Sequence, residues 1–354
     1  MVGRKTEPRR YRLQRRIAAC SSRLPSAFVS ARARVVAVTA LAAALAAGFV
    51  VAVAARSGGE PPPQTKPLQR GGAPPLALDL GFRTDAEARA LRNAADLYAS
   101  GKRAAAAGIF ARYSSVEAQV GETVSRWPDG SVAGLSRLAA LYPKSALVEL
   151  ELGLALYWTG GVGATDAWRQ ATILEPDTSY AVAAANLLYA QYAKNLPVFV
   201  PAETRLLDGL GGKPLREQLG ILRRWAADGV DGNRALGHLL YGVALQRLDH
   251  PLSARREFDR AAELAPDDVE AQVASAVGRF DKADPSAAFS RLGPLARRFP
   301  KSATVRFHLG LLLIWIGSVQ QAKKELRLAT TVDPGSPLAA SARTYLTLIR
   351  NAGR

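Results

Sequence analysis

The chain has 354 residues, of which 48% are hydrophobic and 22% charged, so most of it can form a hydrophobic core. Only 7% of the residues are aromatic, and Ala and Leu predominate, which favours helices over strands. The single cysteine, Cys20, excludes an intrachain disulfide and any metal site built from several cysteines.

The formal net charge of +17 is concentrated at one end of the chain. Residues 1–34 contain ten Lys and Arg but one acid, Glu7, which gives this tail a charge of 10 − 1 = +9. The overall basicity is therefore a property of a short tail and does not indicate a nucleic-acid partner.

Residues 35–55 read VVAVTALAAALAAGFVVAVAA and contain no charged side chain. These 21 residues would form a helix about 31 Å long, which matches a hydrocarbon core of about 30 Å. We therefore expect a single transmembrane anchor in the cell membrane. The basic residues before it predict that the tail 1–34 is cytoplasmic and that the C-terminal domain is extracytoplasmic.

Residues 52–54, Ala-Val-Ala, have the form of a signal-peptidase site. The apolar stretch is longer than the apolar region of a signal peptide, which favours an uncleaved anchor, but cleavage after Ala54 stays open. The Pro- and Gly-rich residues 56–83 then predict an extended linker that holds the next domain away from the bilayer.

Beyond the linker, residues of similar size recur every 34 positions. The columns are Pro266, Pro300 and Pro334; Ala254, Ala288 and Ala322; Gly242, Ala276 and Gly310; Phe258, Leu292 and Leu326; and Ala261, Leu295 and Ala329. A small residue in a first helix allows a second helix to approach closely, and the proline ends that second helix.

This pattern resembles the tetratricopeptide (TPR) repeat, which implies an all-α, TPR-type solenoid of helical hairpins. With the anchor expected at 35–55, the solenoid is preceded by a single transmembrane helix. We expect three TPR repeats at 235–268, 269–302 and 303–336, followed by a capping helix and tail at 337–354. The layout is similar to that of membrane-anchored bacterial TPR proteins that assist secretion, cytochrome assembly or envelope construction.

A phrase from the last repeat, FPKSATVRFHLGLLLIWIG at 299–317, also occurs 157 residues earlier as YPKSALVELELGLALYWTG at 142–160. We therefore expect further TPR-like hairpins over 84–177. Residues 178–234 fit the repeat poorly and predict an irregular helical connector. This connector is either a distorted hairpin or the joint between two short arrays.

No catalytic or metal-binding pattern is present among the remaining motifs. The three histidines, His238, His250 and His308, have no His, Cys or carboxylate partner at metal-ligand spacing. The glycine clusters lack the spacing of nucleotide-binding loops and are typical of turns between helices. We expect no enzyme activity and no cofactor.

In the TPR family, the first helices of successive hairpins line a concave groove in which partner peptides lie. Carried onto this sequence, the early groove residues are Leu147, Leu150, Leu154, Tyr157 and Trp158. The late ones are Leu236, Leu239, Val243, Gln246, Arg247, Glu270, Val273, Val277, Phe280, Asp281, Thr304, Phe307, Leu311, Ile314 and Trp315.

These groove positions are mostly apolar, which predicts a protein partner that presents an apolar or amphipathic segment. The alternative is that the groove is filled from within, by the capping helix, by residues 195–213 or by the tight superhelix itself. For function, we expect a scaffold or adaptor for protein–protein interaction in envelope assembly or secretion. The alternative is a non-catalytic accessory domain that contacts cell-wall polymer or lipid headgroups through a basic face.

Overall fold

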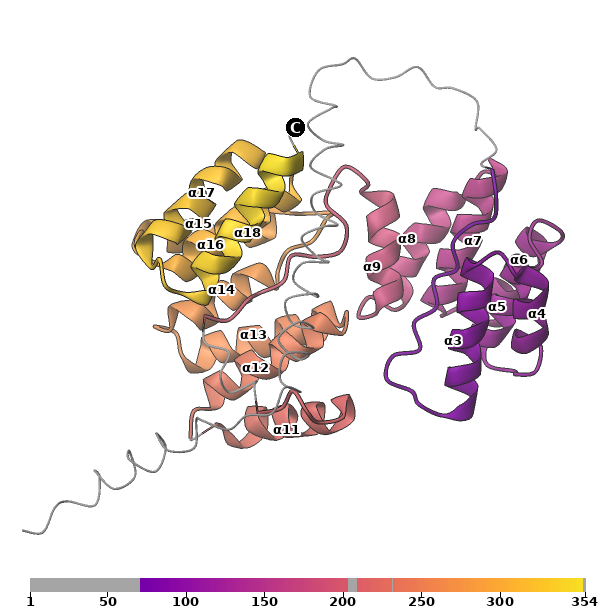
Figure 1. Cartoon of the computed structure of the whole chain (residues 1–354), viewed down its shortest axis with the longest axis horizontal. Coiled ribbons are helices and arrows are strands. Elements are labelled where there is room, and N and C mark those ends of the chain that lie inside the picture. Colours follow the sequence, from indigo (N-terminus) through magenta and orange to yellow (C-terminus); the bar gives the residue numbers. More distant parts are fainter. Residues whose placement is uncertain (1–70, 203–208, 231, 353–354) are drawn as a thin grey trace, which may run out of the picture. The chain divides into compact units, whose positions relative to one another are not determined.

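The computed structural model describes residues 71–202, 209–230 and 232–352 (Figure 1). The basic tail, the predicted anchor at 35–55 and the linker up to residue 70 lie outside the described residues. Within the described part, no helix is both long enough and apolar enough to cross a membrane.

The described residues form fifteen α-helices and no strand, which confirms the predicted all-helical fold. The N-terminal array comprises α3 (Ala86–Ala99), α4 (Arg103–Phe110), α5 (Val116–Ser125), α6 (Ser131–Leu141), α7 (Ala146–Thr159), α8 (Ala164–Leu174) and α9 (Ser179–Leu188). The C-terminal array comprises α11 (Leu215–Asp228), α12 (Arg234–Arg247), α13 (Pro251–Leu264), α14 (Val269–Val277), α15 (Ser286–Arg298), α16 (Ala303–Trp315), α17 (Val319–Val332) and α18 (Pro337–Ala352).

The Pro-Lys-Ser part of the repeated phrase separates one hairpin from the next. Helices α6 and α15 end two residues before Pro143 and Pro300, because a proline disfavours helical geometry in the residue before it. Ser145 and Ser302 then act as N-caps, and each side-chain oxygen accepts the N–H of the third residue beyond it. The same Pro-Lys-Ser motif therefore lies between the end of one helix and the start of the next in both arrays.

Helix packing follows the hairpin order expected of a TPR-like solenoid. Within each array, each helix contacts its neighbour in sequence, and the first helices of successive hairpins also contact one another. These first helices are α3, α5, α7 and α9 in the N-terminal array and α12, α14, α16 and α18 in the C-terminal array. They form one layer of each array, which we call the inner layer, and the second helices form the other.

Close approach within a hairpin depends on glycine. A Cβ atom added at Gly153 would lie 2.4 Å from Trp168 Cδ1, and one added at Gly310 would lie 2.8 Å from Leu326 Cγ. Both distances are far shorter than a van der Waals contact. The small-residue column of the repeat thus admits the bulky side chain of the second helix.

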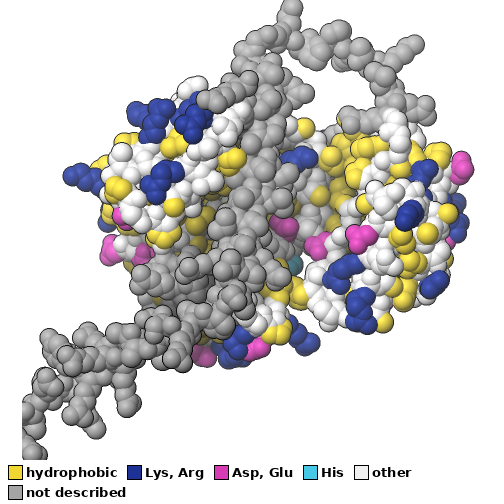
Figure 2. Space-filling model, viewed as in Figure 1, with side chains coloured by type: hydrophobic (Ala, Val, Ile, Leu, Met, Phe, Trp, Pro, Cys, Tyr) yellow, Lys and Arg dark blue, Asp and Glu magenta, His cyan; other side chains and the backbone are white. Residues whose placement is uncertain are grey.

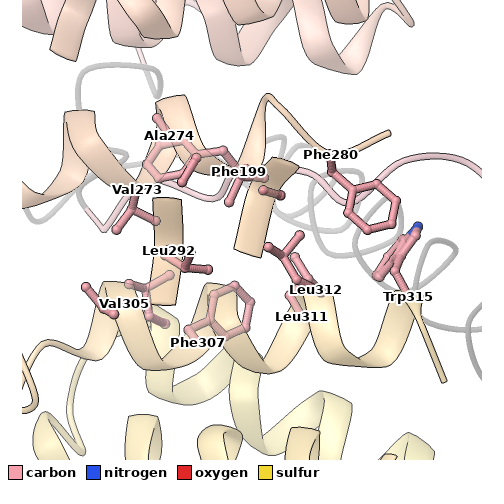
Figure 3. Close-up of a cluster of buried hydrophobic side chains, with 14 of the residues drawn as sticks. Phe199, Val273, Ala274, Phe280, Leu292, Val305, Phe307, Leu311, Leu312 and Trp315 are labelled. Carbon is pink, nitrogen blue, oxygen red and sulfur yellow. The ribbon is translucent and has the colours of Figure 1, made fainter. Parts of the chain in front are cut away.

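Each array has its own buried apolar interior. In the C-terminal array a single cluster runs from α12 to α18 and includes two residues of the preceding connector, Ala193 and Phe199 (Figure 3). In the N-terminal array Leu80, which precedes α3, belongs to the cluster. Both arrays therefore bury a non-helical part of the chain.

This burial changes the expectation for the linker. Residues 71–80 lie within the predicted linker 56–83, but they pack on the N-terminal array, with Pro74 and Leu80 buried. The apolar residues of this stretch, absent from an ordinary Pro/Gly spacer, account for the difference. The predicted connector 178–234 likewise contains two regular helices, α9 and α11, and the described residues between them, 189–202 and 209–214, are not helical.

Candidate functional site

The C-terminal array holds an extended segment of its own chain, residues 193–202, which we call the connector segment. Its buried residues are Ala193, Pro197, Phe199 and Pro201, so from Pro197 onward every second residue is buried. A period of two is the pattern of an extended chain with one face against a surface. In Figure 1 the chain leaves α9 without helical structure and passes α14.

Side chains of first helices bind the backbone of the connector segment. Gln246 on α12 bonds two residues: its Oε1 accepts the Phe199 N–H at 2.7 Å, and its Nε2 donates to the Pro197 carbonyl at 3.1 Å. On α14, a carboxylate oxygen of Glu270 accepts the N–H of Ala202. Three backbone groups are thus satisfied by side chains that the repeat places on the inner layer.

Helix α16 supplies the remaining backbone contacts. His308 Nε2 accepts the Val200 N–H at 2.9 Å, and Trp315 Nε1 donates to the Asn195 carbonyl at 3.1 Å. The Trp315 carbonyl also accepts the N–H of Ala193 at 3.2 Å. First-helix groups therefore bond six backbone groups of the connector segment.

The Phe199 side chain anchors the connector segment in the apolar interior. It is 1% exposed, stacks on the His308 ring at a centroid distance of 4.8 Å, and meets the Phe258 ring edge-on at 5.7 Å. Figure 3 shows it among side chains of α14 and the helices that follow. The aromatic side chain thus fills the space that the predicted groove would leave open.

His308 is neutral in this arrangement. Its Nδ1 lies 2.7 Å from the Thr304 carbonyl, which can only accept, so Nδ1 carries the proton and Nε2 offers the lone pair that Val200 uses. Burial lowers the pKa of His308 to about 4, although the Thr304 carbonyl opposes this shift.

The N-terminal array holds residues 72–80, which we call the linker segment, in a comparable way. Tyr98 on α3 donates its hydroxyl to the Pro74 carbonyl at 2.6 Å. Tyr180 on α9 donates to the Asp79 carbonyl at 2.8 Å and accepts the Asp79 N–H at 3.2 Å. First helices, here α3 and α9, again form hydrogen bonds with the backbone of a non-helical, proline-containing stretch.

Glu151 on α7 provides the central contact with the linker segment. Its side chain is fully buried, and Oε1 accepts the Ala77 N–H at 2.6 Å. Burial raises the pKa of Glu151 to about 8, against the opposing effect of the Ala77 N–H. A carboxyl in this position is therefore protonated over most of the neutral range.

Glu151 and His308 occupy the same place in the repeated phrase, two residues before Gly153 and Gly310. Each is a fully buried polar side chain on a largely apolar first helix, and each accepts one N–H from an extended segment. This role of Glu151 and His308 was not predicted from the sequence. The available signal was a polar residue at equivalent points of two apolar helices.

The predicted groove residues fall into separate sets. The late residues Leu239, Val243, Val273, Val277, Phe280, Phe307, Leu311, Ile314 and Trp315 belong to the same cluster as Phe199. The early residues lie in the N-terminal array, where Leu150, Leu154 and Trp158 pack near Trp168, Leu147 belongs to the neighbouring cluster, and Tyr157 is 38% exposed. No single groove among the described residues unites both sets.

Metal-ligand geometry is also absent from the described ranges, where no group of three or more His, Cys, Asp or Glu could hold an ion. His238 pairs instead with Glu257 of the next helix at 2.6 Å.

Two solved structures are remotely similar to this chain. No protein-family model matches the chain, and no curated protein is significantly similar to it in sequence. Yeast Tom70 is 14% identical with a TM-score of 0.33, over 78% of this chain and 52% of that one. The APC/C hetero-tetramer Cut9-Hcn1 gives 15% identity and a TM-score of 0.29, over 76% of this chain and 56% of the matched one. The chain thus spans little more than half the length of these structures, and its TPR-like fold rests on the hairpin packing described above.

Proposed function

We propose that this chain is a membrane-anchored scaffold that docks another protein on its extracytoplasmic helical arrays, in envelope assembly or secretion. In this proposal residues 35–55 anchor the chain, the basic tail stays in the cytoplasm, and the TPR-like arrays face the other side. The partner presents an apolar segment to the array.

One observation carries the docking role: both arrays hold an extended segment through backbone hydrogen bonds to first-helix side chains. Recognition of this kind depends on free N–H and C=O groups and on alternate apolar side chains, both of which a partner peptide can also supply. The inner layer is therefore chemically suited to binding peptides.

Contact with an anionic polymer or membrane surface has weaker support. On the face drawn in Figure 2, Lys and Arg side chains are scattered among Asp and Glu instead of forming one basic patch. Apolar side chains remain exposed on the N-terminal array, including Leu141 and Val162, which are 64% and 97% exposed. These features favour a protein partner over a polyanion.

Crosslinking in cells tests the docking role. A photo-reactive residue at Val198, on the outward side of the connector segment, should capture one extracytoplasmic protein that mass spectrometry identifies repeatedly. The same residue at Lys324, on the second-helix layer, serves as the matched control and should not capture it. Crosslinks only within the chain from both positions would refute the docking role.

Orientation is tested separately with reporters fused after Arg354. A reporter that requires an extracytoplasmic location should be active, and a cytoplasm-dependent reporter should be silent. The reverse result would overturn the predicted topology while leaving the docking role open to its own test.

A further inference from the structure

The connector segment makes the set of contacts that a bound peptide would make. Six of its backbone groups bond to first-helix residues, and its one aromatic side chain, Phe199, enters the core. None of these contacts depends on a covalent bond to the array. Any extended peptide with the same donors and apolar residues could make them.

We propose that the C-terminal groove lined by Gln246, Glu270 and His308 binds an extended, proline-containing apolar segment of another protein, and that the connector segment is its internal competitor. This inference rests on the proposed docking function, because it names the partner's chemistry. The partner presents N–H groups at the spacing of residues 199, 200 and 202 and buries an aromatic side chain.

The groove selects for this chemistry through its acceptors. The Gln246, Glu270 and His308 acceptors take the N–H groups of Phe199, Ala202 and Val200, so a partner with proline at any of these three positions would lack the corresponding hydrogen bond. Proline is compatible with the flanking positions 197 and 201, where it already occurs. A free carboxylate end is not required, because all six backbone contacts are made by internal N–H and C=O groups of the segment.

Competition follows from the tether. A segment joined to its own groove by a short connection has an effective concentration on the order of millimolar. An external peptide with equal contacts therefore binds weakly to the wild-type chain. Weakening the contacts of the connector segment should restore binding of the external peptide. Such a gain would distinguish a groove with a displaceable segment from a core that is permanently filled.

The test uses the full-length chain in detergent and a fluorescent peptide with the sequence of residues 193–202. The Phe199→Ala variant of the chain should bind this peptide at least about tenfold more tightly than wild type, because the internal segment loses its buried ring. The matched control is Val198→Ala, since Val198 does not pack on the core cluster, and it should bind like wild type.

Two modified peptides then test the binding mode on the Phe199→Ala variant. N-methylation at the Val200 position removes the donor to His308 and should weaken binding about tenfold. N-methylation at the Val198 position, whose N–H makes no hydrogen bond within the described residues, should have little effect. Equal binding of both peptides would overturn the proposal.

A second variant keeps the proposal testable if Phe199→Ala does not fold. Val200→Pro removes the same N–H from the internal segment while keeping Phe199, and it should also increase peptide binding. Failure of both variants to bind, with helical content unchanged by circular dichroism, would refute the proposal. A wild-type dimer that Phe199→Ala dissociates would identify a second copy as the occupant and would also overturn it.

These outcomes are independent of the cellular test. Peptide binding by the variants without any partner in cells would sustain the groove chemistry and refute the docking role. A partner captured at Val198, together with no peptide binding, would refute only this inference.

Discussion

Acidification should release the connector segment through His308. The ring accepts the Val200 N–H only while Nε2 is unprotonated. A proton on Nε2 would place the Val200 N–H and the Nε2–H of His308 in direct repulsion and break the hydrogen bond. Its pKa is about 4 in the folded chain, against a reference value of 6.5. Because the folded pKa is depressed, the stabilisation is fully present above pH 6.5 and is lost as the pH falls through 4.

The magnitude follows from this difference. At pH 5 the opened segment exposes a protonated His308 while the closed one keeps it neutral, which lowers the opening free energy by about 2 kcal/mol. Protection of the Val200 amide against hydrogen exchange, corrected for the intrinsic rate, should fall about twentyfold between pH 7 and pH 5.

Hydrogen exchange measured by mass spectrometry over residues 193–202 checks this prediction. His308→Gln keeps an acceptor without titrating there and should flatten the response. His250→Gln, which removes a ring that does not contact the connector segment, should retain it. Unchanged protection in the wild-type chain between the two pH values would show that protonation of His308 does not release the connector segment.

The N-terminal array should respond to pH in the opposite direction. Glu151 has its pKa raised from 4.5 to about 8, so its contribution is complete below pH 4.5 and is lost as the pH rises through 8, on the order of 5 kcal/mol in total. Glu151→Gln should stabilise the array in urea unfolding at pH 8, and equal midpoints for variant and wild type would contradict this. Gly237→Ala should cost about 1–3 kcal/mol, because the new Cβ would lie 1.9 Å from the Trp225 carbonyl oxygen. Gly293→Ala, on an open helix surface, should be neutral or stabilising by up to about 1 kcal/mol, and similar thermal shifts for the two alanine variants would refute the steric argument. The intact mass of the chain isolated from membranes should include residues 1–54, whereas a mass beginning at residue 55 would show cleavage after Ala54.

The helices were predictable because their signals are local and recur. A helix that must admit Trp168 or Leu326 needs glycine opposite, and a helix that must end needs proline shortly afterwards. Such steric demands leave the same residue types at the same spacing in every repeat. The period therefore predicted the fold and the apolar composition of the inner layer.

The occupants of the grooves could not be predicted with the same certainty. Residues 72–80 and 193–202 occur once each per array, so no period marks them, and their prolines are equally typical of a free linker. The sequence left self-filling and an external ligand open. The structure places the connector segment in the late groove, with Gln246, Glu270 and Trp315 of the predicted set in contact with it.

The polar contacts were the hardest part to foresee. The role of a buried Glu or His on an apolar helix cannot be recognised until its N–H donor is known. That donor lies 74 residues away in sequence for Glu151 and 108 residues away for His308. Alignment of the two phrases does bring these residues into one column. The shared column indicates a shared role only once the two extended segments that these residues bind are known.

The position of each occupant relative to its array affects how the chain is made. Residues 72–80 precede α3, and residues 193–202 precede α12, so a ribosome releases each occupant before the helices that surround it. Each inner layer therefore forms around a segment that is already present, and its apolar side chains are covered as soon as they assemble. Newly made chains thereby avoid the aggregation that an exposed apolar groove would promote. A partner peptide that binds later must displace the segment that already occupies the groove.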